Sequence, residues 1–310
     1  MAIYVNTNVS SLTGRNSLNN VQNSLTTTYQ RLSTGMRINS AKDDAAGLQI
    51  ADRLTTQING LNQGNRNASD GIALAQTAEG ALDEISSMLQ KVRTLAVQAS
   101  TGTLTSDDRA AIQKESDSLV AEITRIATQT TYGGKTILEG GEDVATDTMF
   151  KGDSEAGTLD VQVGANSGDK VTIRVESFVF SQLLDNANIA DMDSKSGLTT
   201  GTLDGVDDRF TFALGMQSKA SAAITTLDAL ISQVDKQRAD LGAIQNRLES
   251  SIRNQSNIVT NESDARSRIR DADFAEESAN LSQQSIIQQA AASMLMQANT
   301  RPQLALSLLG

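Results

Sequence analysis

Apolar residues recur at spacings of three and four positions in both arms of this 310-residue chain. This spacing marks one face of an α-helix, and over several heptads it predicts long helices that pack along one another. The first arm carries it at Ala68, Ile72, Ala75, Ala78, Leu82, Ile85, Leu89, Val92 and Ala96. The last arm carries it at Ile224, Leu227, Ile231, Val234, Leu241, Leu248, Ile252 and Val259. We therefore predict a mainly α fold.

A further helix is predicted to start at Thr105, because Asp108 completes a capping box with it. Its apolar positions are Ile112, Leu119, Ile123 and Ile126. Aromatic residues make up 3% of the chain, Trp is absent and there is one proline. Large aromatics usually fill globular cores, whereas Ala, Leu and Ile suffice for helix-on-helix seams. We expect the three helices to form an elongated bundle or coiled coil.

The centre of the chain differs in composition from both arms. Twelve of the 22 glycines fall between Gly133 and Gly215, and residues 139–210 hold 15 Asp and Glu against five Lys and Arg. Alternating apolar residues at 158–163 and 170–175 flank a Gly/Asn turn, which predicts a β-hairpin. The acidic excess suits a solvated outer face, whereas the nearly neutral arms can pack against copies of themselves without self-repulsion.

Both chain ends carry a further apolar stripe. At the N-terminal end it comprises Leu18, Val21, Leu25, Tyr29 and Leu32. At the C-terminal end it comprises Phe274, Leu281, Ile286, Ile287, Ala290, Ala291, Met294, Leu295, Leu306 and Leu309. Asp273 and Glu276 predict a capping box at the start of the last helix, and Pro302 predicts its end. Since such helices gain little stability alone, we expect the two ends to pair.

Residues for common catalytic chemistry are missing. Without His or Cys there is no His general base, thiol nucleophile or His/Cys zinc site. We interpret Asp43 and Asp44 as complementing a helix start, and Asp207 and Asp208 as a solvated turn. We predict no enzyme activity, cofactor or metal. The sequence also lacks a basic patch with aromatics and an apolar run of about 18 residues, so we expect neither nucleic-acid binding nor membrane insertion.

A mixed run of charges lies just before the last helix, with Arg266, Arg268 and Arg270 among acidic neighbours. Such a run is usually a solvated junction held by exposed ion pairs of small individual value. It also suits a charged joint between the bundle and the terminal pair. Both interpretations stay open.

Several motifs resemble those of bacterial flagellins. Residues 31–47, RLSTGMRINSAKDDAAG, closely resemble the family signature RLSSGxRINSAKDDAAG. GLNQ from Gly60, RNASDGI from Arg66 and AQTAEGAL from Ala75 follow in family order and spacing. IRDADFAEE at 269–277 and the closing residues 297–309 resemble the flagellin C-terminus. The resemblance covers roughly residues 1–180 and 210–310.

The resemblance implies a fold of two parts. Residues 1–44 and 267–310 would form the terminal coiled-coil pair called D0. Residues 45–180 and 210–266 would form the D1 bundle with its β-hairpin region. Residues 181–209 would be a short, variable, acidic insertion at the outer surface, so we expect no large outer domain.

The function implied is that of a self-assembling subunit of the tubular flagellar filament. In the family, subunits leave through the flagellar export apparatus and act outside the cell, which agrees with a start that lacks the basic and apolar regions of a secretory signal. The implied partners are other flagellin copies, an export chaperone at the C-terminus, and the hook-associated junction and cap proteins. The apolar stripes at both chain ends would supply the polymer interface.

Residues 88–99, MLQKVRTLAVQA, resemble the LQRVRELAVQ segment that the flagellin-sensing Toll-like receptor binds. Gln90, Leu95 and Glu115 match the receptor-contact pattern, whereas Lys91 stands where the pattern has Arg. A lysine point charge does not replace the planar arginine fork, so we expect weakened recognition. The same stretch is also a bundle seam, and both interpretations can hold on different faces.

Three alternatives remain. A hook–filament junction protein shares flagellin-like ends, although a full signature favours the filament subunit. An unrelated helical scaffold or adaptor would give a soluble oligomer of defined size. A flagellin with an inserted protease domain would need an HExxH motif, which a chain without histidine cannot supply.

Overall fold

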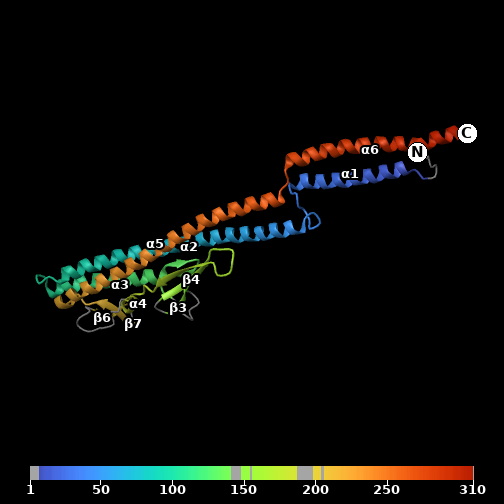
Figure 1. Cartoon of the computed structure of the whole chain (residues 1–310). Coiled ribbons are helices and arrows are strands. Elements are labelled where there is room, and N and C mark those ends of the chain that lie inside the picture. Colours follow the sequence, from blue (N-terminus) through green and yellow to red (C-terminus); the bar gives the residue numbers. More distant parts are fainter. Residues whose placement is uncertain (1–6, 141–147, 154–155, 187–197, 204–205, 310) are drawn as a thin grey trace. The chain divides into compact units, whose positions relative to one another are not determined.

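The computed structural model describes residues 7–140, 148–153, 156–186, 198–203 and 206–309 (Figure 1). Residue contacts divide the chain into two units. Unit 1 comprises Met1–Asn59 and Ile258–Gly310, and unit 2 comprises Gly60–Asn257. Within the described residues, helices predominate and the strands are few and short, so the predicted mainly α fold is confirmed.

The helices follow the periodic stretches of the sequence and extend beyond them. They are α1 Val9–Thr34, α2 Ala45–Ala99, α3 Ser106–Gln129, α4 Phe180–Asn186, α5 Gln217–Arg270 and α6 Phe274–Leu309. The predicted capping box at the start of α3 is confirmed, since the Thr105 hydroxyl accepts from the Asp108 N–H and the Asp108 carboxylate accepts from the Thr105 N–H. The hydrogen bonds from Thr105 hold the pKa of Asp108 below its ordinary value.

All strand pairs among the described residues are antiparallel. The strands are β1 Thr131–Tyr132, β2 Lys135–Thr136, β3 Lys151–Asp153, β4 Ala156–Gln162, β5 Lys170–Glu176, β6 Leu198–Leu203 and β7 Val206–Phe212. They form the sheets β1-β2, β3-β4-β5 and β6-β7. The predicted hairpin is confirmed as β4 and β5, with Thr158 opposite Arg174 and Val161 opposite Val171. The expected insertion at 181–209 lies partly outside the described residues, as do the side chains of Asp207 and Asp208.

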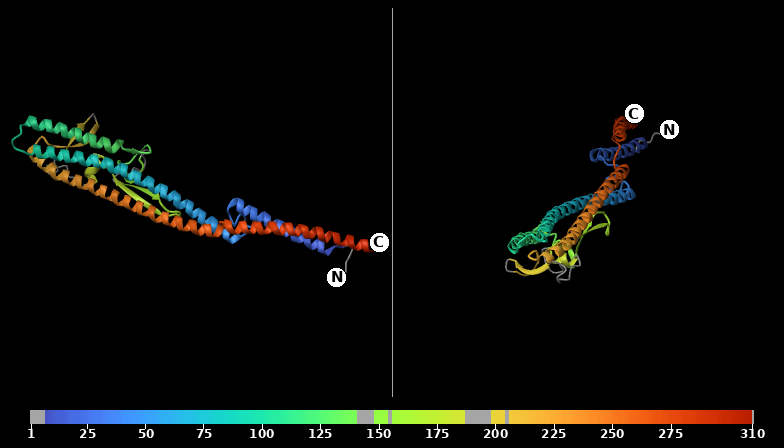
Figure 2. Two further views of the ribbon diagram at one scale, coloured as in Figure 1. Left: turned by 90° about the horizontal axis from the view of Figure 1, so that it is seen from above. Right: turned by 90° about the vertical axis from the view of Figure 1, so that its left-hand side faces the viewer.

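In unit 2, the helices α2, α3 and α5 lie side by side (Figure 2). The core-facing side of α2 is fully buried at Leu82, Ile85 and Leu89, as the three-and-four spacing predicts. Ion pairs across the surface, Arg93 with Asp228 at 2.5 Å and Arg238 with Asp83 at 2.9 Å, show that α2 and α5 run antiparallel. At Leu82, Ile85 and Leu89 the seam of α2 is therefore aliphatic, and the ion pairs lie outside it.

The few phenylalanines gather where strands and α4 close the core of unit 2. Phe150, Phe178, Phe180 and Phe212 are buried there. The rings of Phe180 and Phe212 meet edge to face, with centroids 5.5 Å apart and planes inclined by 74°. Aromatic residues thus fill the irregular space beside the sheets, which regular helix seams do not leave.

Glycines on α2 let the hairpin lie directly on the helix backbone. A Cβ at Gly64 would stand 1.9 Å from the carbonyl oxygen of Val163, and a Cβ at Gly60 would stand 2.8 Å from the Cβ of Ala165. Glycine inside a helix costs about 1 kcal/mol relative to alanine. Here the cost is offset by a contact that no residue with a side chain could make.

Side-chain amides hold strand ends against helices. The Gln237 amide of α5 donates to the Arg174 carbonyl at 2.9 Å and accepts from the Glu176 N–H at 3.4 Å. Gln113 of α3 makes the same pair of contacts with the Phe212 carbonyl and the Leu214 N–H. In each case one amide satisfies a carbonyl and an N–H two residues apart, as a neighbouring strand would.

The predicted end of the last helix at Pro302 is wrong, because α6 continues to Leu309. Proline has no N–H to donate to the carbonyl four residues earlier, which belongs to Ala298. That carbonyl accepts instead from the side-chain amide of Asn8, at 2.8 Å. The oxygen of the same amide caps α1 by accepting from the Ser11 N–H at 3.1 Å. One asparagine therefore serves two helices.

Candidate assembly surface

The two chain ends form an antiparallel helix pair within unit 1. Asn8 contacts Ala298, Gln22 accepts from Gln288 at 2.8 Å, and Thr28 contacts Gln284 at 3.4 Å, so partner numbers fall as α1 advances. The expected pairing of the chain ends is therefore present. Several of its cross-helix contacts are polar.

The seam between α1 and α6 contains six of the predicted large apolar residues. Leu18, Val21, Leu25 and Leu32 of α1 and Leu281 and Leu295 of α6 are buried or half-buried. Gly14 brings the helices close, since a Cβ there would stand 3.2 Å from a methyl carbon of Leu295. Sequence periodicity alone assigned no role to this glycine.

Five other large apolar residues of the predicted stripes lie away from this seam. Tyr29, Phe274, Ile286, Ile287 and Met294 are exposed, with Met294 at 68%. Together with other exposed large apolar residues they make up a group that we call the outer apolar set: Val9, Leu12, Tyr29, Phe274, Ile286, Ile287, Met294 and Met296. The side chains of Leu306 and Leu309 lie outside the described part of the chain. Exposed large apolar side chains are candidates for contact with another molecule.

An ion pair lies in the same seam. The Arg31 guanidinium donates to the Glu277 carboxylate at 2.9 Å, and the Glu277 side chain is only 8% exposed. Arg31 belongs to the RLSTG stretch and Glu277 to the IRDADFAEE stretch. A partly buried pair of this kind favours one register, since a shift along the helix would leave each charge unpaired.

The same two stretches also meet through their backbones. The Arg37 N–H donates to the Arg270 carbonyl at 2.7 Å, and the Ala272 N–H donates to the Gly35 carbonyl at 2.9 Å. The Arg37 guanidinium donates to the Ile269 carbonyl at 2.7 Å. Gly35 has a φ of 69°, a conformation that glycine adopts without strain. The loop after α1 is therefore tied to the junction between α5 and α6.

Of the three arginines before this junction, Arg268 is exposed and Arg266 and Arg270 are half-buried, with the Arg266 guanidinium donating to the Thr55 hydroxyl at 3.4 Å. Arg268 pairs with Asp264 at 3.0 Å, with both side chains more than half exposed. Arg270 lies 3.9 Å from Asp52. The interpretation as exposed ion pairs of small individual value fits Arg268, whereas Arg270 is half-buried. The backbone bonds described above make the tighter connection at the junction.

Asp43 and Asp44 are local structural residues, as expected. The Asp43 carboxylate accepts from the N–H groups of Asn39 and Ser40 and from the Ser40 hydroxyl, and these bonds, the Ser40 backbone first, hold its pKa below the ordinary value. The Asp44 carboxylate accepts from the Gly47 N–H at 2.9 Å at the start of α2. Each carboxylate is engaged with backbone donors, so the two do not form an acid–base pair.

The receptor-contact candidates separate into two groups. Gln90, Lys91 and Glu115 are exposed, and the Lys91 ammonium lies 3.4 Å from the Glu115 carboxylate, joining α2 to α3. Leu95 is 8% exposed and belongs to the bundle core. The structure therefore brings Lys91 and Glu115 together, leaves Gln90 exposed on α2 and places Leu95 in the core.

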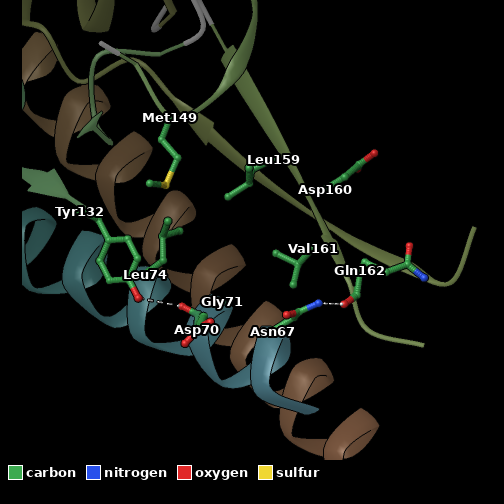
Figure 3. Close-up of a pocket in the computed structure, with 10 residues that line it drawn as sticks. All are labelled: Asn67, Asp70, Gly71, Leu74, Tyr132, Met149, Leu159, Asp160, Val161 and Gln162. Carbon is green, nitrogen blue, oxygen red and sulfur yellow. Dashed lines mark hydrogen bonds between the residues drawn. The ribbon is translucent and has the colours of Figure 1, made fainter. Parts of the chain in front are cut away.

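A hollow of about 370 Å³ lies between α2 and β4 (Figure 3). Its lining residues are Asn67, Asp70, Gly71, Leu74, Tyr132, Met149, Leu159, Asp160, Val161 and Gln162. Figure 3 shows Leu159 and Val161 pointing toward α2 and Asp160 pointing away, as strand alternation requires.

Two polar side chains at the hollow, those of Asn67 and Asp160, are already engaged. The Asn67 amide donates to the Gln162 carbonyl at 2.9 Å. Asp160 accepts from Lys170 at 2.6 Å and from Thr172 at 2.7 Å, and these bonds, led by that of Lys170, lower its pKa. The ten lining residues supply no pairing of nucleophile and base, so the hollow offers space for an apolar group and no evident chemistry.

The described residues meet the requirements of neither a metal site nor a membrane-spanning helix. No group of three or more potential metal-ligating side chains occurs among them. None of their helices is long and apolar enough to cross a membrane.

Comparisons with known proteins give a consistent result. The family model for the bacterial flagellin N-terminal helical region matches residues 5–143, and that for the C-terminal helical region matches residues 224–309. Polar flagellin C of Vibrio parahaemolyticus is 36% identical and flagellin A of Vibrio cholerae is 37% identical, each over the full length of both chains. Flagellin D of Vibrio anguillarum is 38% identical over the same extent.

Two solved structures match part of the chain. The Bacillus cereus flagellin is 28% identical, with a TM-score of 0.44, and the match covers 61% of this chain and 88% of that one. A putative flagellar hook-associated protein from Vibrio parahaemolyticus is 17% identical, with a TM-score of 0.54 and coverage of 74% and 100%, which indicates a shared fold. On the family models and the full-length relatives, this chain belongs to the bacterial flagellins and is a structural subunit of the flagellar filament.

Proposed function

We propose that the outer apolar set is the surface through which α1 and α6 pack against neighbouring copies in the filament. The observation that carries the proposal is that these helices keep large apolar side chains exposed outside the seam. One side is covered by the intrachain seam, while Tyr29, Ile287 and Met294 on other sides stay exposed. A filament subunit needs contacts with other copies that continue along the polymer and do not close into a small ring. A surface separate from the seam within the chain is available for such contacts.

On this proposal, each part of the chain also has a position in the filament. We infer that residues 1–44 and 267–310 act as the filament's inner domain and residues 45–180 and 210–266 as the surrounding bundle, with 181–209 as a short outer insertion. The acidic excess of the central residues supports a solvated outer position for that insertion. The same outer set would contact the hook-associated junction and cap proteins at the filament ends.

We propose export in an unfolded form through the flagellar apparatus and function outside the cell. Exposed Ile286, Ile287 and Met294 would make the free subunit prone to premature association. A chaperone at the C-terminus would cover this helix before export. The polar and ionic seam contacts, each of modest value, suit a helix pair that forms only after passage.

Replacement of Ile287 by Glu tests the assembly surface. A buried carboxylate without a partner opposes packing strongly, so Ile287→Glu should not form filaments under conditions in which the parent does. Gln289→Glu is the matched control, since residue 289 is also exposed on α6 and already polar. Sedimentation and electron microscopy measure polymer yield, and circular dichroism checks helix content. Normal filaments from Ile287→Glu at the parental critical concentration would overturn the proposal.

We further propose weak recognition by the flagellin-sensing receptor through Gln90, Lys91 and Glu115. Lys91 lacks the planar fork of arginine, and its ammonium is engaged by Glu115 at 3.4 Å. Leu95, being buried, would act by supporting this surface. A receptor reporter assay tests the point: Lys91→Arg should be more potent than the parent. Equal potency would refute the assigned weakness.

A further inference from the structure

Three methionines of the described chain are exposed to almost the same extent. Met294 is 68% exposed, Met296 is 65% exposed and Met216 is 64% exposed. Met36, Met88 and Met149 are half-buried. Thioether oxidation depends on access of the oxidant to sulfur, so the three exposed side chains should react at similar rates in the free subunit.

The surroundings of the three methionines differ. Met294 and Met296 flank Leu295, whose side chain enters the seam beside Gly14, so both thioethers lie away from the seam. Met294 stands seven residues after exposed Ile287 and therefore on the same side of α6. Met216 precedes α5 in unit 2.

We propose that Met294 and Met296 form an oxidation site that controls assembly, sensitive to peroxide in the free subunit and protected in the filament. This inference rests on the proposed function of the outer apolar set. Burial against neighbouring copies would remove both sulfur atoms from the solvent. The oxidant is therefore effective only before a subunit joins the polymer.

The reaction is a two-electron oxygen transfer. A sulfur lone pair attacks one oxygen of hydrogen peroxide, the O–O bond breaks, an S–O bond forms, and the second oxygen leaves as water after proton transfer. Sulfur is oxidised to the sulfoxide and peroxide is reduced. Thiol-dependent methionine sulfoxide reductases reverse the step and return the thioether.

The sulfoxide changes the contact surface from apolar to polar. Its oxygen would have to enter a neighbour-facing contact without a designated donor, which opposes burial. We expect the critical concentration for polymerisation to rise by about tenfold for each buried sulfoxide, equivalent to about 1.4 kcal/mol. The helix pair itself should persist, because neither thioether lies in the seam.

The test compares peroxide-treated full-length subunits, with sulfoxides counted by peptide mass spectrometry. The parent and Met216→Leu should lose assembly, whereas the double variant Met294→Leu/Met296→Leu should keep it, since leucine conserves volume and cannot be oxidised. Treatment with a sulfoxide reductase should restore the parent. Equal loss of assembly by the double variant would overturn the proposal.

Preformed filaments provide a second test. Met294 and Met296 should oxidise at least about tenfold more slowly in filaments than in free subunits, and equal rates would contradict the protection. The unoxidised variant Met294→Glu/Met296→Glu tests the interface separately from the oxidation site. If this double glutamate variant assembles normally, the outer set is not an interface. If it fails to assemble while the fully oxidised parent assembles normally, the interface stands and only the oxidation site is refuted.

Discussion

Replacement of Asn8 by Ser tests how α6 continues past its proline. Serine caps a helix about as well as asparagine, so the bond to the Ser11 N–H has a substitute, while the amide donor to Ala298 is lost. The Ala298 carbonyl then has neither the missing proline N–H nor a side-chain donor. A half-buried bond of this kind contributes about 0.5–1.5 kcal/mol, and we expect Asn8→Ser to destabilise the end of α6 by about 1 kcal/mol.

A double-mutant cycle isolates this contact. Pro302→Ala restores an N–H that can reach the Ala298 carbonyl, so Asn8→Ser should cost little in that background. Hydrogen exchange of peptides from residues 290–309, measured by mass spectrometry, reports the local opening of α6. About 1 kcal/mol corresponds to roughly fivefold faster exchange in the single variant. An equal effect of Asn8→Ser in the parent and in the Pro302→Ala background would refute the compensation of proline by asparagine.

Three further predictions concern named contacts. Glu277→Gln should lower the free energy of unfolding in urea by about 1–3 kcal/mol, because Arg31 stays half-buried without its carboxylate, whereas Asp264→Asn at an exposed pair should change it by less than about 0.5 kcal/mol. Gly64→Ala should destabilise the folded chain by more than about 2 kcal/mol, because the new Cβ clashes with the backbone of Val163. Gly80→Ala has open space around it and should stabilise the folded chain by up to about 1 kcal/mol. Thermal melts that rank the two variants in the opposite order would contradict the packing. The lowered pKa of Asp108 contributes stability above its ordinary value of 3.8 that is lost as pH falls through the folded value, so Asp108→Asn should flatten the fall in stability below pH 3.8.

Regular elements could be predicted because their signals are local. Apolar residues at helical spacing identified α2, α3 and α5, and alternation around a Gly/Asn turn identified β4 and β5. The capping box of Thr105 and Asp108 fixed a helix start to the residue. Each of these signals depends on neighbours within a few turns of the same element, so one sequence contains all the information needed.

Contacts between distant segments could not be predicted in the same way. The role of Gly64 depends on the hairpin that crosses it, and the role of Gln237 depends on the carbonyl and N–H groups at the end of β5. The continuation of α6 through Pro302 depends on Asn8, which is 290 residues away from the carbonyl it satisfies. A rule for proline alone therefore predicted the wrong helix end, because tertiary contact replaced the missing donor.

The division between seam and outer surface shows a more basic limit. Leu281 and Leu295 in the seam, and Ile287 and Met294 outside it, all satisfy helical spacing on α6. Periodicity therefore predicts that an apolar side exists and leaves open which side meets α1. Apolar contact is nondirectional, so it selects neither side strongly.

Polar contacts decide that choice. Arg31 with Glu277 and Gln22 with Gln288 are directional, and rotation of either helix by one position would separate them. They place Glu277 in the seam and turn Ile287 and Met294 outward. The side of α6 that carries these polar contacts thus forms the pair within the chain, and Ile287 and Met294 stay exposed on another side. On the proposed function, a helix pair arranged in this way has modest stability alone and gains from assembly, because its exposed apolar area is then buried between subunits.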